Sequence, residues 1–247
     1  MALEDATKLI QAFLLSGKQY VCLMQLHGDA PESRVRSVID EFKGDIYQRP
    51  PLRASVKREI RKRRIYDIDI LEIDQRRALF TVDCQAGTYV RKLCSDMGEV
   101  LGFGADMREL RRTRAGPFKE EKSTTIHELL NAFLEMKEHK NERGLREVIR
   151  PMEEAVEYLA KIYMRDSAVD AICHGADLAV PGIVKLDQEI RPGTTVAFLS
   201  LKGEAIALGR ALVSSEHMLR EDRGIAAKTT RVIMPPGTYP PMWRKNK

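Results

Sequence analysis

The chain has 247 residues, of which 43% are hydrophobic and 31% charged; this composition fits a folded globular protein and excludes collagen, coiled coil and wholesale disorder. At about 100–200 residues per domain, we expect two modest domains. Lys and Arg exceed Asp and Glu by 41 to 36, a formal net charge of +5, so the distribution of charge is more informative than its sum. The longest apolar runs, such as residues 12–15, are far shorter than the ~20 residues of a membrane-spanning helix. We therefore expect no transmembrane helix and, because residues 1–6 do not resemble a signal peptide, an intracellular protein.

The first half of the chain alternates between helical and extended patterns. Apolar residues at helical spacing predict helices over residues 4–15, from Pro31 to Gly44, and from residue 90 to the stop at Gly102. Alternating or β-rich runs predict a strand over 20–27 and a hairpin formed by 65–73 and 78–84. Two further segments are expected to be an extended, Pro-rich loop over 48–52 and an edge strand over 110–118.

The second half changes character near residues 151–159. Before this boundary, residues 129–148 have a polar helical pattern that predicts a surface helix pair or a linker. After it, short β-rich runs over 183–186, 194–201 and 204–213 are separated by glycine turns. This pattern predicts a small β-barrel of about 75–80 residues.

No motif for a metal or a nucleotide cofactor is present in the sequence. The four cysteines include no Cys-x-x-Cys pair, and the five histidines show no ligand spacing. Gly102-Phe103-Gly104 lacks the rest of a dinucleotide-binding loop, and no His-Glu-x-x-His occurs. We therefore expect neither a zinc site nor a disulfide framework.

Positive charge gathers in two places. Residues 53–64 contain seven cations against the single acid Glu59, and a second cluster follows at Arg108, Arg111, Arg112 and Arg114. One such run is usually a solvated face, but two clusters of one sign favour a polyanionic partner, and we expect phosphate. The arginines of residues 110–118 fit either an edge strand with an exposed face or a phosphate site, because the guanidinium fork pairs with two phosphate oxygens.

The segment Ala86-Gly87-Thr88-Tyr89-Val90-Arg91 reads as a strand end, a glycine turn and a helix start. Arg91 falls in the first turn, where the positive end of the helix dipole disfavours a cation unless an anion is near. Its side chain either pairs with a carboxylate or phosphate, or extends into water at a cost of some tenths of a kcal/mol. Tyr89 and Tyr20 are each either core residues or rings that stack on a base.

Five motifs follow one another along the chain: Ala6-Thr7-Lys8, Lys18-Gln19-Tyr20, residues 48–57, residues 87–91 and residues 110–118. Together they resemble one family over nearly the whole chain, the TruB-type RNA pseudouridine synthases. The resemblance rests on five motifs in order, followed by the loop His174-Gly175-Ala176-Asp177-Leu178-Ala179-Val180-Pro181-Gly182, which resembles that of a PUA RNA-binding domain. The Arg-Pro-Pro-Leu-Arg segment and the His174–Gly182 loop are most similar to the archaeal and eukaryotic dyskerin-type subunit of box H/ACA particles.

The resemblance implies an α+β fold with a mixed, largely antiparallel sheet and helices, followed by a small β-barrel PUA domain. It places the catalytic domain at residues 1–155 and the PUA domain at 156–237. The implied activity is the isomerisation of uridine to pseudouridine in rRNA or tRNA, guided by a box H/ACA RNA, without a cofactor or metal. The implied partners are the guide RNA, the substrate RNA and the small accessory proteins of the particle. No association with a membrane is implied.

The resemblance also assigns residues. Tyr20 would stack near a target base that is flipped out of its helix, Tyr89 would line the pocket, Arg91 would pair with a catalytic aspartate, and Leu110 would be an apolar wall. A cation-rich loop would grip substrate RNA, and the PUA loop would hold the ACA end of the guide. The RNA-binding residues so implied are Arg53, Lys57, Arg58, Arg61, Lys62, His174, Gly175, Ala176, Leu178, Pro181 and Gly182.

One family motif is absent from the printed chain. The catalytic aspartate of the family belongs to a Gly-x-Leu-Asp-Pro loop shortly before the Ala-Thr-Lys motif, and here Met1 stands five residues before Ala6. We therefore expect a truncated version of the guide-dependent enzyme that is inactive as written. The alternative is a non-catalytic RNA-binding or scaffold paralogue. A cytoplasmic, archaeal protein is expected, because the long Lys-rich tail of eukaryotic dyskerins is missing; a eukaryotic one would be nucleolar.

Overall fold

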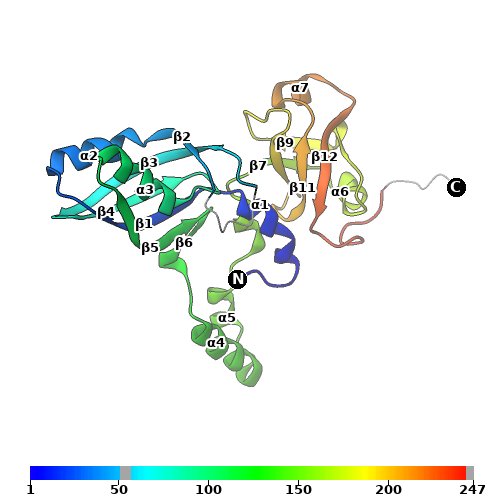
Figure 1. Cartoon of the computed structure of the whole chain (residues 1–247). Coiled ribbons are helices and arrows are strands. Elements are labelled where there is room, and N and C mark those ends of the chain that lie inside the picture. The colour runs from blue at the N-terminus through cyan, green and yellow to red at the C-terminus, as the bar shows by residue number, and fades with distance from the viewer. Residues whose placement is uncertain (51–56, 243–247) are drawn as a thin grey trace. The chain divides into compact units, whose positions relative to one another are not determined.

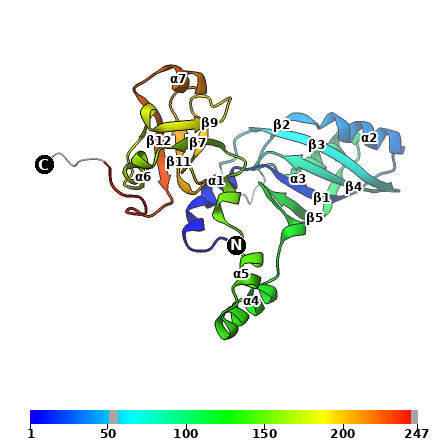
Figure 2. The same ribbon diagram turned by 180° about the vertical axis from the view of Figure 1, so that it is seen from behind.

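The computed structural model describes residues 1–50 and 57–242, which form two compact units (Figures 1 and 2). The N-terminal unit is Leu14–Ser123, and the C-terminal unit combines Met1–Phe13 with Thr124–Lys247. Within the described ranges, no helix has both the length and the apolar character that a membrane span requires.

The N-terminal unit is built on a six-stranded sheet in the order β2-β3-β4-β1-β5-β6, with every neighbouring pair antiparallel. The predicted strand over 20–27 and the predicted hairpin are confirmed as β1, β3 and β4. The strands are β1 (Lys18–Leu26), β2 (Gly44–Gln48), β3 (Arg61–Asp74), β4 (Arg77–Cys84), β5 (Ala105–Ala115) and β6 (Phe118–Lys119).

Two sequence-based expectations for this sheet are wrong in part. The cation-rich loop expected over 53–64 already becomes strand at Arg61, because pairing with the edge strand β2 extends β3 beyond its apolar stretch. The loop expected over 48–52 starts one residue too early, since Gln48 closes β2 opposite Arg61. Pro51 and Leu52 lie outside the described residues.

Helices α2 (Glu32–Glu41) and α3 (Val90–Leu101) pack on the sheet, and their apolar sides complete one core (Figure 1). Gly102, with φ +95°, ends α3 as predicted. Gly98 allows α3 to meet the start of β5, because a Cβ at this position would lie 2.0 Å from the backbone nitrogen of Ala105. The buried core includes Cys22, Met24, Phe80, Val82, Val35, Ile39, Leu93 and Met97.

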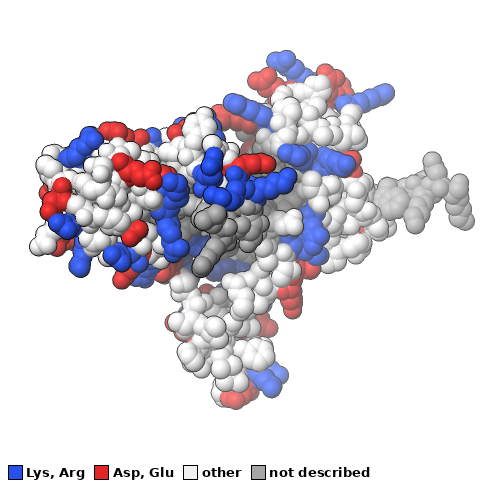
Figure 3. Space-filling model, viewed as in Figure 1, with Lys and Arg blue, Asp and Glu red and all other residues white. Residues whose placement is uncertain are grey.

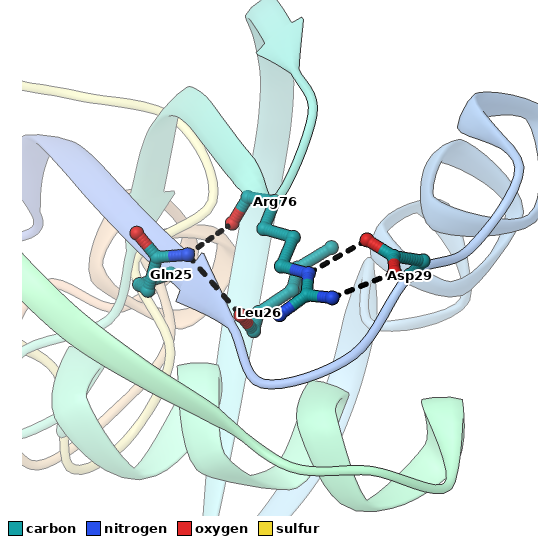
Figure 4. Close-up of polar contacts among 4 residues, drawn as sticks. All are labelled: Gln25, Leu26, Asp29 and Arg76. Carbon is teal, nitrogen blue, oxygen red and sulfur yellow. Dashed lines mark hydrogen bonds and ion pairs between the residues drawn. The ribbon is translucent and has the colours of Figure 1, made fainter.

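Polar contacts join the end of β1 to the β3–β4 turn (Figure 4). The guanidinium of Arg76, in that turn, donates from Nε and Nη2 to the two carboxylate oxygens of Asp29, at 2.6 Å each. The side-chain amide of Gln25 donates to the carbonyl oxygens of Leu26 and Arg76, at 3.2 and 3.1 Å. These bonds orient the chain as it leaves the sheet for α2.

The C-terminal unit holds a second six-stranded sheet, in the order β8-β12-β11-β10-β7-β9, in which only the β7–β10 pair is parallel. The three predicted β-rich runs are confirmed as β9, β10 and β11. Its strands and helices are β7 (Ala160–Met164), α6 (Asp166–Cys173), β8 (Leu178–Ala179), β9 (Ile183–Leu186), β10 (Thr195–Leu199), β11 (Ala205–Ala211), α7 (Ser215–Arg220) and β12 (Ile225–Val232).

The helix predicted over residues 4–15 is a 3-10 helix, Glu4–Leu9, followed by the short α1 (Ile10–Leu14). Leu9 and Ala12 are buried against residues of the C-terminal unit, including Val156 and Ile233, and Lys8 donates to the Ile233 carbonyl at 2.9 Å. These contacts with the distant chain explain why residues 1–13 group with the C-terminal unit. The polar helix pair is confirmed as α4 (Ile126–His139) and α5 (Arg143–Val148).

Candidate active site and nucleic-acid interface

Tyr20 lies on β1 between β4 and β5, opposite Val82 and Arg112. Its ring is half-buried against the core of the N-terminal unit. Burial raises the pKa of the Tyr20 hydroxyl, while the Arg112 guanidinium, which hydrogen-bonds to this hydroxyl, opposes the shift. The hydroxyl is therefore a neutral phenol at neutral pH.

A tight turn leads from β4 to α3. The Thr88 amide and hydroxyl donate to the Gln85 carbonyl at 3.2 and 2.7 Å, and Gly87 has φ +79°. Arg63 of β3 donates from Nε to the Gly87 carbonyl at 3.2 Å. Thr88 also hydrogen-bonds to the thiol of Cys84, and burial raises the pKa of that thiol to about 11, so Cys84 is neutral at neutral pH.

Tyr89 is half-buried and immediately precedes α3. Its backbone is held by the side-chain amide of Gln48, whose Oε1 accepts from the Tyr89 nitrogen at 3.0 Å and whose Nε2 donates to the Tyr89 carbonyl at 3.2 Å. Gln48 is 2% exposed, so both bonds are shielded from water. The position of Tyr89 is thus set jointly by the turn before it and by β2 beside it.

Arg91 is exposed in the first turn of α3, which contains no acidic residue. Within residues 1–50 and 57–242, no carboxylate lies at ion-pair distance from its guanidinium. The positive end of the helix dipole adds to this local charge. The sequence left two alternatives open for the Arg91 side chain, an anionic partner or extension into water. The described residues supply no carboxylate partner, so the guanidinium is available to an anion.

Leu110 is on β5 opposite Cys22 and is 39% exposed. The register between β1 and β5 shifts between Gln19 and Tyr20, so that Thr113 falls between the residues paired with them. A bulge of this kind bends a strand and re-aims its side chains. Leu110 and Arg112 therefore lie on β5 next to the part of β1 that carries Tyr20.

Several cations close to this part of the sheet are engaged within the protein. Lys18 is buried, and its Nζ donates to the carbonyls of Leu14 and Ser16 at 2.7 and 2.6 Å. Burial, followed by the charge of Arg112, lowers the pKa of Lys18. These bonds make Lys18 a structural residue at the start of β1.

Two arginines of residues 110–118 are also paired with carboxylates. Arg114 donates from Nη2 to both carboxylate oxygens of Asp83 at 2.6 Å, and Arg111 donates to Glu120 at 2.9 Å. The first pair is partly buried and joins β5 to β4, whereas the second is more exposed. Arg111 and Arg114 thus each have a carboxylate partner within the protein.

The implied RNA-gripping cations have different surroundings. Arg53 lies outside the described residues, Lys57 and Arg58 are exposed, and Arg61 begins β3. Lys62 forms an ion pair with Asp45 at 2.9 Å. Over the visible surface of the N-terminal unit, basic and acidic side chains are interleaved in this way (Figure 3).

The loop implied to bind RNA in the C-terminal unit follows α6. Gly175 has φ +90° and makes the turn, and Thr229 of β12 donates from its amide to Asp177 at 2.9 Å and from its hydroxyl to the Ala176 carbonyl at 2.6 Å. Leu178, Pro181 and Gly182 line a hollow of about 290 Å³ between this loop and α6. His174, Gly175 and Ala176 are exposed at the start of the loop and do not line the hollow.

The sequence marked three residues of the site only as members of a motif or a charge cluster, and not for the contacts that they make: Gln48 and Arg63, which hold the turn and Tyr89, and Arg112, which contacts Tyr20. Gln48 lies 41 positions from Tyr89, and neither spacing nor periodicity connects them. The one signal in the sequence that marks Gln48 is that a polar residue stands at the end of a strand, where its side chain is directed into the protein. Within the described residues, no group of three or more potential metal ligands was found.

Comparisons with known proteins agree across the chain. The model of the TruB family pseudouridylate synthase N-terminal domain matches residues 28–90, that of the tRNA pseudouridylate synthase B C-terminal domain matches residues 91–157, and that of the PUA domain matches residues 160–233. The chain is 57% identical to the probable tRNA pseudouridine synthase B of Methanopyrus kandleri over 243 residues, covering 98% of this chain and 72% of the relative. The corresponding protein of Pyrococcus abyssi is 52% identical over 244 residues, covering 98% and 73%.

Solved structures extend the same similarity to three dimensions. A chain in the crystal structure of a Cbf5-Nop10-Gar1 complex superimposes with a TM-score of 0.93 at 52% identity, covering 97% of this chain and 73% of that one. A chain in the structure of an H/ACA RNP bound to a substrate RNA containing 2'-deoxyuridine gives a TM-score of 0.89 at 48% identity, covering 98% and 74%. With the expected α+β fold thereby confirmed, the chain belongs to the TruB family of pseudouridine synthases and carries a PUA domain.

Proposed function

We propose that this protein is an RNA pseudouridine synthase that isomerises uridine in rRNA or tRNA as the guide-dependent subunit of a box H/ACA particle. The observation that carries the proposal is the similarity over 97% of the chain to a subunit of the Cbf5-Nop10-Gar1 complex. The tRNA target class is supported by the names of relatives with 50–57% identity. Guide RNA, substrate RNA and proteins of the Nop10 and Gar1 kind are the proposed partners.

The reaction breaks the bond between N1 and C1′ of uridine and forms one between C5 and C1′. The C5 proton is lost and N1 gains a proton, so the change is an isomerisation without net oxidation. A base inside a helix is inaccessible to this chemistry and has to be flipped into a pocket. In the proposed arrangement Tyr20 stacks near the flipped base, Tyr89 lines the pocket, and Leu110 forms an apolar wall.

Arg91 is proposed to pair with the catalytic carboxylate of the reaction. Support comes from its exposed guanidinium at the start of α3, for which the described part of the chain supplies no carboxylate. The family's Gly-x-Leu-Asp-Pro loop would supply one. We expect the 247 printed residues alone to be inactive for want of this loop.

RNA binding is proposed for two surfaces. Lys57, Arg58, Arg61 and Lys62, with Arg53, would contact phosphates of the substrate RNA. The PUA loop, including the hollow lined by Leu178, Pro181 and Gly182, would hold the ACA end of the guide, with His174, Gly175 and Ala176 at its rim. We place the boundary between the catalytic and PUA domains at residues 155 and 156, and the protein in the cytoplasm of an archaeal cell.

The direct test uses RNA transcripts labelled with [5-³H]uridine, from which the reaction releases tritium. The full-length gene product, with guide RNA and accessory proteins, is expected to release tritium from a matched substrate and none without the guide. RNA binding without any release would instead establish the non-catalytic scaffold. Release by the 247-residue polypeptide itself would contradict the expected inactivity.

A further inference from the structure

Gln48 is a buried polar residue that makes two hydrogen bonds to one residue of another segment. At 2% exposure, its Oε1 accepts from the Tyr89 N–H at 3.0 Å and its Nε2 donates to the Tyr89 carbonyl at 3.2 Å. Only this orientation of the amide pairs each donor with an acceptor. The side chain thereby makes the pair of bonds that a residue of a neighbouring antiparallel strand would make through its backbone.

The backbone of Tyr89 depends on this external partner. Its N–H precedes the first turn of α3 and has no partner within the helix, and its own side chain makes no capping hydrogen bond. Its carbonyl accepts from Leu93 at 3.0 Å, the first bond of the helix, and also from Gln48. Gln48 thus acts as a cap supplied from β2, at the junction between a glycine turn and the helix.

We infer that Gln48 is a positioning residue that holds Tyr89, and the first turn of α3 behind it, in the orientation needed for the flipped nucleotide. The inference rests on the proposed function, in which Tyr89 lines the pocket. Two bonds to one residue restrain the rotation of its two flanking peptide groups, and so set the direction of its Cα–Cβ bond. Gln48 itself acts through Tyr89 and is not assigned a contact with RNA.

The decisive variant is Gln48→Met, which keeps the length of the side chain and removes both hydrogen bonds. Gln25→Met is the matched control, because the Gln25 amide also bonds to backbone carbonyls, those of Leu26 and Arg76 (Figure 4). Both proteins are labelled with 3-fluorotyrosine, and the Tyr89 signal in ¹⁹F NMR is assigned by Tyr89→Phe. We expect this signal to shift or split in Gln48→Met and to stay unchanged in Gln25→Met. A Tyr89 signal that stays unchanged in Gln48→Met, as in Gln25→Met, would overturn the inference.

Kinetics supply a second readout that loss of general stability would not mimic. For the full-length gene product in its particle, we expect Gln48→Met to lower the single-turnover rate of tritium release about tenfold and to leave the Kd for labelled RNA within about twofold. Gln25→Met should change neither quantity. If the unsubstituted protein releases no tritium, the proposed function fails, while the ¹⁹F signal still decides whether Gln48 positions Tyr89.

Gln48→Glu provides a conditional rescue. An ionised glutamate can accept from the Tyr89 N–H but repels the Tyr89 carbonyl, whereas a protonated one can donate to it. Burial raises the pKa of a carboxyl group, so lowering the pH from about 8 to about 5.5 should restore the rate of this variant relative to the unsubstituted protein at the same pH. A constant ratio of the two rates over that range would contradict the role assigned to the Gln48 donor.

Discussion

The guanidinium of Arg63 lies against Gly87. Its Nε donates to the Gly87 carbonyl at 3.2 Å, and its Nη2 is 3.2 Å from the point where a Cβ on Gly87 would stand. A third contact, from Nη1 to the Lys62 carbonyl at 3.0 Å, limits how far the side chain can withdraw. In the turn that leads to Tyr89, Arg63 therefore occupies the space that a side chain at residue 87 would need.

Gly87→Ala should destabilise the N-terminal unit for two reasons. A φ of +79° costs an L-residue roughly 1–2 kcal/mol, and the added methyl group also displaces Arg63. Gly44→Ala is the control, because Gly44 has φ +100° but nothing within 4 Å of its Cβ position. Urea unfolding should show a larger loss in the free energy of unfolding for Gly87→Ala than for Gly44→Ala. Equal losses would mean that the Arg63 side chain moves aside without an energetic cost.

Arg91→Ala should abolish catalysis in the full-length gene product and leave RNA affinity nearly unchanged. The reason is that the guanidinium is proposed to pair with the catalytic carboxylate, while many phosphate contacts share the binding energy. Tritium release and Kd measured on the same preparation check this expectation. Arg34→Ala, at an exposed position of α2, serves as the control for the loss of one surface charge. A normal rate for Arg91→Ala would refute the assigned role.

The salt dependence of RNA binding should reveal which cations meet phosphate. Removing one cation that binds a phosphate reduces the slope of log K against log salt concentration by about 0.7–0.9. Arg58→Ala should show a reduction of this size. Lys62→Ala should show less, because Asp45 already pairs with Lys62 at 2.9 Å. A slope near zero for the unsubstituted protein would argue against phosphate contacts altogether.

The stability of the N-terminal unit should depend on pH through Asp29. Hydrogen bonding to Arg76 lowers the pKa of the Asp29 carboxyl in the folded protein, so its contribution is present above the pKa of the unfolded chain. It is lost as the pH falls through the folded value. The difference in thermal unfolding between the protein and Asp29→Asn should therefore shrink between about pH 6 and about pH 2.5.

Asp69→Asn is the matched control for that measurement. Asp69 is exposed on β3, and no ion pair to it was found in the part of the chain that the structure describes. This substitution should leave the acid dependence of unfolding unchanged. A difference for Asp29→Asn that persists undiminished at the lowest pH would show that the Arg76 contact does not depend on the carboxylate charge.

Elements defined by local chemistry were predictable from the sequence. The periodic apolar residues of α3 and its glycine stop at residue 102 predicted that helix, and the β3–β4 hairpin followed from two β-rich runs around one turn. The ordered motifs also led to the TruB family, which the comparisons confirm. Each of these inferences uses residues that are close together in the chain or a spacing that the family retains.

The contacts that shape the candidate site were not predictable in this way. Arg114 is held by Asp83, and Lys62 by Asp45, so charge clusters in the sequence overstated the number of free cations. The strand β3 extends to Arg61 because β2 pairs with it, although the residues there are charged. Pairing and burial between distant segments override local propensity.

The sequence by itself determined the family, the helices and strands with strong periodicity, and the segments that bear Tyr20, Tyr89 and Arg91. Only the tertiary structure decided that Gln48 and Arg63 hold the turn before α3, and that residues 1–13 pack with the C-terminal unit. The physical reason is that a hydrogen bond or a buried contact depends on distance in space. Residues 41 positions apart, such as Gln48 and Tyr89, meet only after β2 and β4 have joined the same sheet.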